Sequence, residues 1–157
     1  MDQRFASLVE TLAPKLEELR GMEPLRYGAL PRTMTLSGVC LFSEGDRHMY
    51  VGRSNVLRKR HGRHCGPGAT YRQAAFAFLL AREQTGRMKG SYKAGAESRA
   101  GLMELPEFRA AFEAAKLRIR KMDYRFVQEE DQTGKHFWKS IAQLFSKHHT
   151  TISRRIS

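Results

Sequence analysis

Cysteine, tryptophan and acidic side chains are all scarce in this chain of 157 residues. Its two cysteines, Cys40 and Cys65, are too few for the disulfide framework of a small secreted domain. Cys65 follows His61 and His64, but no second ligand pair has the spacing of a zinc site. The N-terminus lacks a secretory signal pattern, and no run of about 18 apolar residues is present. We therefore expect a cytoplasmic protein with no membrane partner, folded as one domain around one core.

The scarcity of acids leaves a strong positive charge. The chain has 28 Lys and Arg residues against 16 Asp and Glu, for a formal net charge of +12 and a pI of about 10.2. Residues 134–157 carry cations and no acid, and the rest of the chain is clearly basic without them. This charge predicts a polyanionic partner, although charge alone does not separate DNA from RNA or from an anionic membrane surface.

A β-hairpin followed by a basic helix is predicted near the middle of the chain. Residues 39–42 and 49–51 are short apolar runs, and the polar turn between them has Gly45-Asp46 at its centre. The second strand ends at Gly52, after which Ser54 or Asn55 can cap a helix. The basic residues of this helix are Arg58, Lys59, Arg60, Arg63 and His64.

Four side chains of this region can converge on one basic surface. Arg60 and His64 are four residues apart and so share a helix face, where Arg53 and the Tyr50 hydroxyl can join them. A phenol beside two guanidiniums and an imidazole, with few acids nearby, suits a phosphodiester. The plainer alternative is a small α/β module with a solvated cationic face, in which Tyr50 is a strand aromatic and His64 lies on the helix surface.

Two tripeptides and two spacings make this region resemble the GIY-YIG endonuclease family. Arg60 follows Tyr50 by ten residues and His64 follows it by fourteen, which are the usual family positions of an arginine and of a histidine or tyrosine. The tripeptides are Gly38-Val39-Cys40, in place of Gly-Ile-Tyr, and Tyr50-Val51-Gly52, in place of Tyr-Ile-Gly. The resemblance covers the hairpin and the first helix closely, is looser to about Glu130, and suggests a small single-domain bacterial or phage-type member.

The resemblance implies an α/β fold with a three-stranded, mainly antiparallel sheet flanked by helices, and hydrolysis of DNA phosphodiester bonds with one divalent metal, Mg²⁺. It makes Tyr50, aided by Arg53 or by a metal-bound water, the general base that activates water. Arg60 would stabilise the transition state and His64 would orient the nucleophile. Cys40 departs from the usual tyrosine and cannot donate as a phenol does. The DNA-binding residues would be Arg58, Lys59 and Arg63.

The spacing of apolar residues and the positions of Gly and Pro predict the other elements. We expect a connector over 21–36, a helix ending at Gly86, and a strand over 124–127 that joins the hairpin. The other expected segments are an N-terminal amphipathic helix over 4–20, a helix over 70–85, a mobile basic loop over 87–98 and a helix over 106–122.

The helix over 106–122 has an apolar side and a basic end. We expect its apolar side to be buried, with Phe108, Phe112, Ala115 and Leu117 inside. The cations at its end suit both a helix C-terminus and a phosphate-facing surface. They are Lys116, Arg118, Arg120 and Lys121.

The chain departs from the family after the third strand. The family has a metal-binding glutamate there, often in Leu-Leu-Glu, and later Pro-Tyr-Asn, whereas residues 134–141 are basic and Lys139 falls at the glutamate position. Loss of one base near codon 133 explains this, because the codons of Phe137, Trp138 and Lys139 read as Leu-Glu in the neighbouring frame. The alternative is a divergent basic tail that binds nucleic acid. The expected divisions are an N-terminal helix and connector (1–36), a nuclease-like domain (37–133) and an atypical basic tail (134–157), to which both explanations apply.

The sequence thus predicts a DNA endonuclease, catalytically impaired if the metal-binding glutamate is missing. One alternative is a non-catalytic nucleic-acid-binding protein that uses the same basic face. Another is a basic interaction protein that binds its partner through the N-terminal amphipathic helix. The sequence assigns no oligomeric state.

Overall fold

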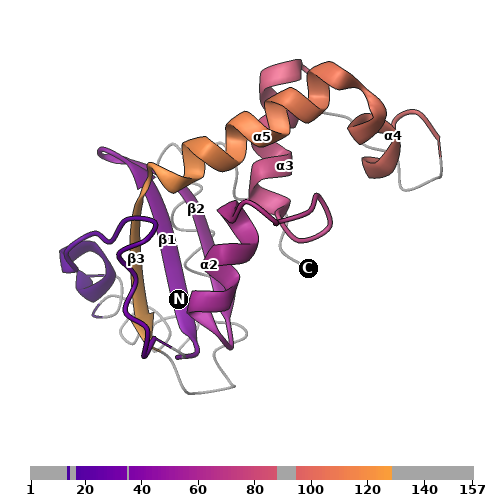
Figure 1. Ribbon diagram of the computed structural model, residues 1–157. Helices are drawn as coiled ribbons and strands as arrows, with labels where there is room; N and C mark the ends of the chain where they lie inside the picture. Colours follow the sequence, from indigo (N-terminus) through magenta and orange to yellow (C-terminus); the bar gives the residue numbers. More distant parts are fainter. Residues whose placement is uncertain (1–13, 15–16, 35, 88–94, 129–157) are drawn as a thin grey trace, which may run out of the picture. The chain divides into compact units, whose positions relative to one another are not determined.

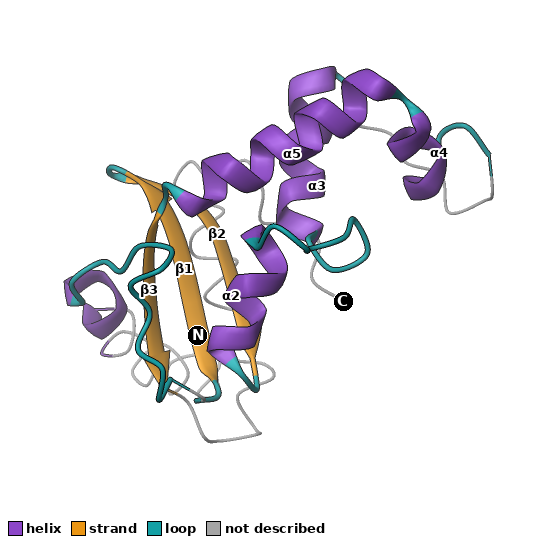
Figure 2. Ribbon diagram, in the orientation of Figure 1, coloured by secondary structure: helices purple, strands orange, loops and turns teal. Residues whose placement is uncertain are grey.

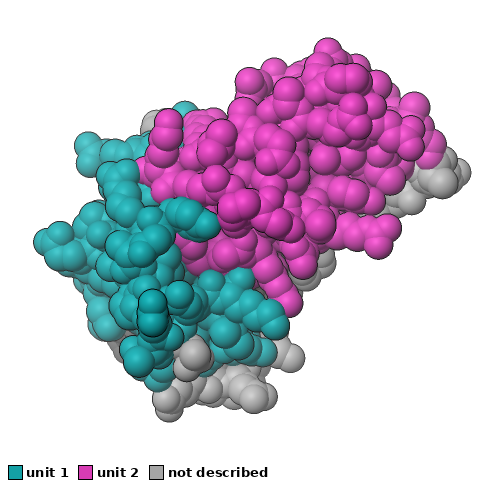
Figure 3. Space-filling model, in the orientation of Figure 1, with its two compact units in different colours: residues 1–59, 122–157 teal, residues 60–121 magenta. Residues whose placement is uncertain are grey.

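The computed structural model describes residues 14, 17–34, 36–87 and 95–128, and the chain divides into two compact units (Figure 3). Unit 1 comprises Met1–Lys59 and Met122–Ser157, and unit 2 comprises Arg60–Lys121. The expected N-terminal helix is described at residue 14 and from 17, where residues 17–21 are helical. Most of the expected basic loop and the whole tail, including Lys139, lie outside the described residues.

An antiparallel sheet of three strands in the order β2-β1-β3 forms the centre of unit 1 (Figure 1). The strands are β1 (Gly38–Glu44), β2 (Arg47–Ser54) and β3 (Asp123–Gln128). β1 and β2 are joined by Gly45 and Asp46, and Gly45 has the positive φ of +58° that a tight hairpin turn favours. Together with the described helices, this sheet confirms the predicted α/β class and the third strand.

Apolar side chains of all three strands fill the core of unit 1. Phe42 on β1 contacts the ring of Tyr124 on β3, with 4.9 Å between ring centroids, and the ring of Tyr50 on β2, with 6.2 Å. Leu19, from the expected N-terminal stripe, is also buried at 1% exposure. The connector reaches the sheet through Leu25, whose backbone exchanges two hydrogen bonds with Tyr124.

The predicted basic helix is α2 (Leu57–Cys65), which follows β2 after a short turn (Figure 2). The Ser54 hydroxyl accepts a hydrogen bond from the Val56 amide at 3.1 Å, so Ser54 is the residue that turns the chain toward the helix. The Leu57 amide donates to the Leu36 carbonyl at 3.0 Å. The helix ends before Gly66, as the Gly-Pro-Gly sequence that follows requires.

Unit 2 contains the rest of α2 and three further helices, α3 (Ala75–Thr85), α4 (Arg99–Glu104) and α5 (Pro106–Arg120). Helices α3 and α5 pack through aromatic rings, with Phe78 at 5.0 Å from Phe108 and 6.4 Å from Phe112 between centroids. α3 ends at Gly86, which takes the left-handed conformation as predicted. None of the helices in the described parts of the chain is long and apolar enough to span a membrane.

Two expectations about these helices are wrong. The helix expected from residue 70 begins at Ala75, because the amides of Gln73 and Ala74 both bond to the Thr70 carbonyl in a turn. Leu117, expected inside α5, is 52% exposed, and Lys116 is buried in its place at 2%. The short helix α4 was not predicted.

Candidate nucleic-acid interface

The Tyr50 ring lies on the backbone of Gly52, two residues further along β2. A Cβ atom at Gly52 would lie 2.8 Å from Tyr50 Cε1, closer than real Cβ contacts allow. Side chains two residues apart share one face of a strand, so a larger residue at Gly52 would displace the phenol. The second half of the tripeptide pattern therefore has a local structural reason, because the glycine makes room for the tyrosine.

Gly38 must be glycine because of a neighbouring strand rather than a side chain. It pairs with Ser54 on β2 and with Gln128 on β3, and a Cβ atom there would collide with the carbonyl oxygen of Val127. Cys40, two residues on, is fully buried in the middle strand between Gly52 and Phe126. Both positions serve the close packing of the sheet.

Arg53 lies on the opposite face of the sheet from Tyr50. The β1–β2 register is regular from Phe42↔Tyr50 to Gly38↔Ser54, and residues three apart on a strand alternate in direction. Arg53 donates from Nη1 to Asn55 Oδ1 at 3.3 Å, and its buried Nε has no hydrogen-bond partner in the structure as described. Strand geometry therefore does not bring this predicted pair to one face.

Arg60 and His64 do come together on α2. They are one helical turn apart, and the Arg60 charge is one of the causes that lower the pKa of His64. Arg60 is half-buried, and its buried Nε, like that of Arg53, has no hydrogen-bond partner within the described ranges. A guanidinium N–H that is out of water and has no acceptor nearby favours an anionic ligand.

His64 is a core residue, and the interpretation of it as a helix-surface residue is wrong. Its side chain has no exposure and meets the Phe76 ring edge-on, with centroids 6.3 Å apart. Burial, and then the charges of Arg60 and His61, lower its pKa to about 3. The imidazole is therefore neutral at physiological pH, and it is both a poor proton acceptor and shielded from solvent.

The three residues predicted to bind DNA differ in their roles. Arg58 is exposed but already engaged, because Nη1 donates to the carbonyls of Leu30 at 3.0 Å and Pro31 at 2.7 Å. It ties the connector to the start of α2. Lys59 and Arg63 are exposed on the same helix, where they are available to a ligand.

The second cysteine has no feature of a nucleophile. Cys65 is buried, with Sγ 3.4 Å from the His61 carbonyl and 3.9 Å from His61 Nδ1. Burial raises the pKa of this thiol to about 11, despite the nearby positive charge of Arg120. Cys65 is therefore a protonated packing residue at neutral pH.

The largest electrostatic feature of the chain is an acid-free segment, residues 47–82. No Asp or Glu occurs between Asp46 and Glu83. Within the described structure, Arg58 is bound by two backbone carbonyls, and five other cations of the segment form no ion pair. They are Arg53, Lys59, Arg60, Arg63 and Arg72. All the cations of the segment are Arg47, Arg53, Arg58, Lys59, Arg60, Arg63, Arg72 and Arg82.

The described residues do not supply a site for Mg²⁺. Among them, no group of three or more His, Cys, Asp or Glu side chains could hold a metal ion. The acid-free segment provides no carboxylate oxygen, which is the ligand that Mg²⁺ prefers. The described donor set therefore does not fit the metal that the resemblance implies.

Sequence reasoning named Lys116 and Arg120 only as cations for a helix end or a phosphate-facing surface. Lys116 is instead buried and donates to carbonyls of the segment after α2, and Arg120 donates to the carbonyl of Cys65 at the end of α2. A signal was present, since Lys116 falls at the same spacing as Phe108, Phe112 and Ile119, on the buried side of α5. A cation at a core position predicts a specific set of acceptors.

Comparisons of the chain with protein-family models, with curated proteins and with solved structures found no match.

Proposed function

We propose that this protein binds DNA on the hairpin-and-helix plan of the GIY-YIG endonucleases, and that the chain as it stands cleaves DNA weakly or not at all. The observation that carries the proposal is the acid-free segment over 47–82, which folds as β2, α2 and most of α3. A region with eight cations and no carboxylate repels other cations and attracts a polyanion over its whole length.

The state of the arginines supports the same proposal. Arg53 and Arg60 each have a buried Nε without an acceptor among the described residues, and Arg63 is exposed and forms no ion pair there. Phosphate oxygens provide the acceptors that such guanidiniums need, often two at a time. Contacts of this kind go to the DNA backbone, so we expect little sequence preference.

The proposal of weak or absent cleavage rests on the side chains that could act as a base or bind a metal. Tyr50 is the general base that the resemblance implies, whereas His64 is shielded from solvent and is a poor base because burial lowers its pKa. Tyr50 is 5% exposed and lies against Gly52. Among the described residues, no group of three or more His, Cys, Asp or Glu side chains could hold a divalent cation. A bound DNA would therefore lack the charge stabilisation that hydrolysis requires.

A binding assay with matched charge variants tests the proposal. Fluorescence anisotropy of a labelled duplex of about 20 base pairs should show binding by the wild type. Arg60→Gln and Arg63→Gln should each weaken it about eightfold at about 0.1 M salt, the effect of losing one phosphate contact. Arg109→Gln, which removes the same charge from an exposed position on α5, should change it less than about twofold. Equal losses for all three variants would contradict an interface in the acid-free segment.

Two further experiments distinguish DNA from other polyanions and binding from cleavage. Competition with duplex RNA and with anionic lipid vesicles identifies the polyanion, and we expect DNA to compete best. Plasmid nicking in the presence of Mg²⁺ measures the chemistry. Robust nicking that Tyr50→Phe abolishes would show an active endonuclease and would contradict the weak-cleavage half. A cytoplasmic location is part of the same proposal, since DNA is reached there.

A further inference from the structure

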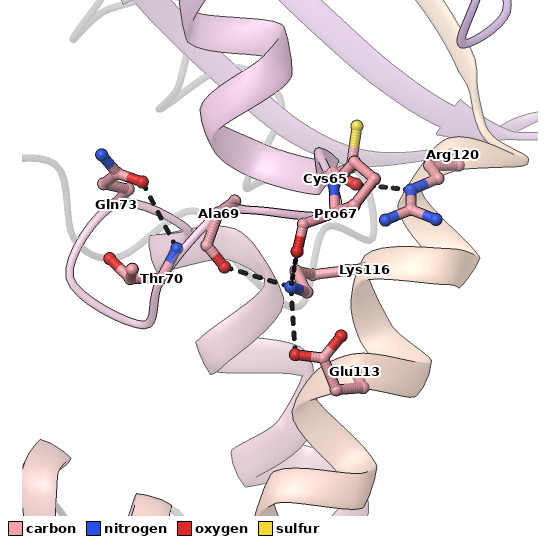
Figure 4. A network of polar contacts seen from close by, with 8 residues as sticks. All are labelled: Cys65, Pro67, Ala69, Thr70, Gln73, Glu113, Lys116 and Arg120. Atoms are coloured by element: carbon pink, nitrogen blue, oxygen red, sulfur yellow. Dashed lines mark hydrogen bonds and ion pairs between the residues drawn. The ribbon is translucent and has the colours of Figure 1, made fainter.

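Two cations of α5, the buried Lys116 and the half-buried Arg120, bind backbone carbonyls in the loop after α2 and at the end of α2. Lys116, only 2% exposed, donates from Nζ to the carbonyls of Pro67 and Ala69, both at 3.1 Å, and pairs with Glu113 at 3.0 Å (Figure 4). One turn later on α5, Arg120 Nε donates to the Cys65 carbonyl at 2.5 Å. Figure 4 shows both side chains pointing from α5 to the same stretch of backbone.

The loop also has its own internal bonds. The Ala69 amide donates to the Gly66 carbonyl at 3.0 Å, and the Gln73 amide donates to the Thr70 carbonyl at 3.0 Å. The Gln73 side chain accepts from the Thr70 amide at 3.3 Å. Cations and amides of unit 2 thus take up the backbone carbonyls at 65, 66, 67, 69 and 70. These bonds fix the shape of an exposed turn region, residues 66–73, which we call the contact loop.

The outer side of the contact loop presents hydrogen-bond donors and a cation. Thr70, Arg72 and Gln73 are exposed, and Tyr71 is half-buried. The Arg72 guanidinium lies over the Tyr71 ring, 5.7 Å from its centroid, and Nε donates to the Tyr71 hydroxyl at 3.4 Å. Stacking on an aromatic ring reduces the freedom that an arginine loses when it binds.

We propose that the contact loop is a preformed site for the phosphate backbone of DNA, and that Lys116 and Arg120 are its positioning residues. The loop lies within the acid-free segment and follows the exposed Arg63 of α2, and the carboxylate of Glu113 on α5 is bound by Lys116. Hydroxyl, amide and guanidinium donors are the groups that contact phosphate and sugar. A lipid surface is a poorer match, because the exposed residues of the loop include no large apolar side chain.

The proposal gives the two kinds of residue different tasks. Arg72 touches the phosphate, so its loss removes one released counterion from the binding equilibrium. Lys116 does not reach the DNA, because its charge is enclosed by the two carbonyls and Glu113. Lys116 therefore affects binding indirectly, by holding Arg72 in place. This inference rests on the proposed function, since it names a surface through which the same protein contacts DNA.

A salt titration of three variants tests the inference. The slope of log K against log salt should be smaller in magnitude by about 1 in Arg72→Gln than in the wild type, with affinity about eightfold lower at about 0.1 M salt. Arg109→Gln is the matched control, eleven residues and about 16 Å before Arg120 on α5, and should leave the slope unchanged. Lys116→Met keeps the length of the side chain and should lower affinity to a similar degree.

The double variant distinguishes positioning from general damage. If Lys116 acts through Arg72, adding Lys116→Met to Arg72→Gln should weaken binding less than twofold beyond Arg72→Gln alone. Arg120→Lys keeps the charge but loses the Nε contact, and it provides a second positioning variant if Lys116→Met does not fold. Fully additive losses would overturn the positioning role.

The outcomes for the two proposals are separate. A wild type that binds DNA, with Arg72→Gln indistinguishable from Arg109→Gln, would overturn the contact loop and leave the proposed function standing. A folded wild type that does not bind DNA at low salt would overturn both.

Discussion

Acidification from about pH 7.5 to about pH 5 should remove about 2 kcal/mol of unfolding free energy through His64 alone. In the folded protein the pKa of His64 is lowered to about 3, mainly by burial, whereas the unfolded chain has the ordinary value of 6.5. At about pH 7.5 His64 is neutral in both the folded and the unfolded state. Below 6.5 the unfolded chain binds a proton that the folded protein does not, so the stability present above that pH is lost as the pH falls toward 3.

The magnitude follows from the two pKa values. Each pH unit below 6.5 lowers the free energy of unfolding by about 1.4 kcal/mol. The loss is therefore about 2 kcal/mol at about pH 5 and about 4–5 kcal/mol at about pH 3. Urea unfolding followed by far-ultraviolet circular dichroism measures the free energy at each pH. Because the pKa of His48 is also lowered, chiefly by burial, the wild type should lose more than the His64 contribution.

A variant isolates the contribution of His64. His64→Leu fills the same buried space beside Phe76 with an apolar side chain that does not titrate. Its loss between about pH 7.5 and about pH 5 should be smaller than that of the wild type by about 2 kcal/mol. If both proteins lose the same free energy over this interval, His64 is not held neutral by burial, and the account of its environment is wrong.

Gly38→Ala should destabilise the fold by about 1–3 kcal/mol in the same urea experiment, because the new methyl group collides with the Val127 carbonyl. Gly62→Ala, in open space within α2, is its control and should instead stabilise by about 0.5–1 kcal/mol. Lys116→Met should cost about 2–4 kcal/mol, since two carbonyls lose a charged donor; a loss below about 0.5 kcal/mol would show that the network does not stabilise unit 2. Restoring the reading frame near codon 133 should return Leu-Leu-Glu and Mg²⁺-dependent plasmid nicking together, and sequencing the gene there checks the premise.

The sheet was predictable because its signals are local. Two apolar runs, a Gly-Asp turn and the alternation over 124–127 each indicate a strand without reference to the rest of the chain. The sequence predicted that the third strand joins the hairpin, but it did not predict that β3 pairs with β1 rather than with β2. The start of α5 at Pro106 was equally clear, because proline fits the first turn of a helix.

Other features depend on contacts that no local pattern records. The helix predicted to start at residue 70 starts at Ala75 in the structure, because a turn takes up the Thr70 carbonyl. The choice between Leu117 and Lys116 for the buried side of α5 depends on the carbonyls at Pro67 and Ala69, nearly 50 residues earlier. Short elements such as α4, six residues long, have too few turns for periodicity to register.

The candidate site was predictable in part for the same reason. The spacing of Arg60 and His64 on one helix placed them together, as the helical repeat requires. Strand alternation could have shown that Tyr50 and Arg53 point to opposite faces, but the predicted strand ended at Gly52, and the longer β2 was not foreseen. The burial of His64 comes from packing against Phe76, which the sequence does not reveal.

The salt dependence of duplex DNA binding by the unmodified protein tests the central claim most directly. Besides Arg58, which backbone carbonyls bind, five cations of the acid-free segment form no ion pair in the described structure. Contact with about five phosphates gives a slope of log K against log salt between about −4 and −5. Doubling the salt from about 0.1 M to about 0.2 M should then weaken binding about twentyfold. A slope shallower than about −1, or no binding at low salt, would contradict the claim that this segment is a DNA-binding surface.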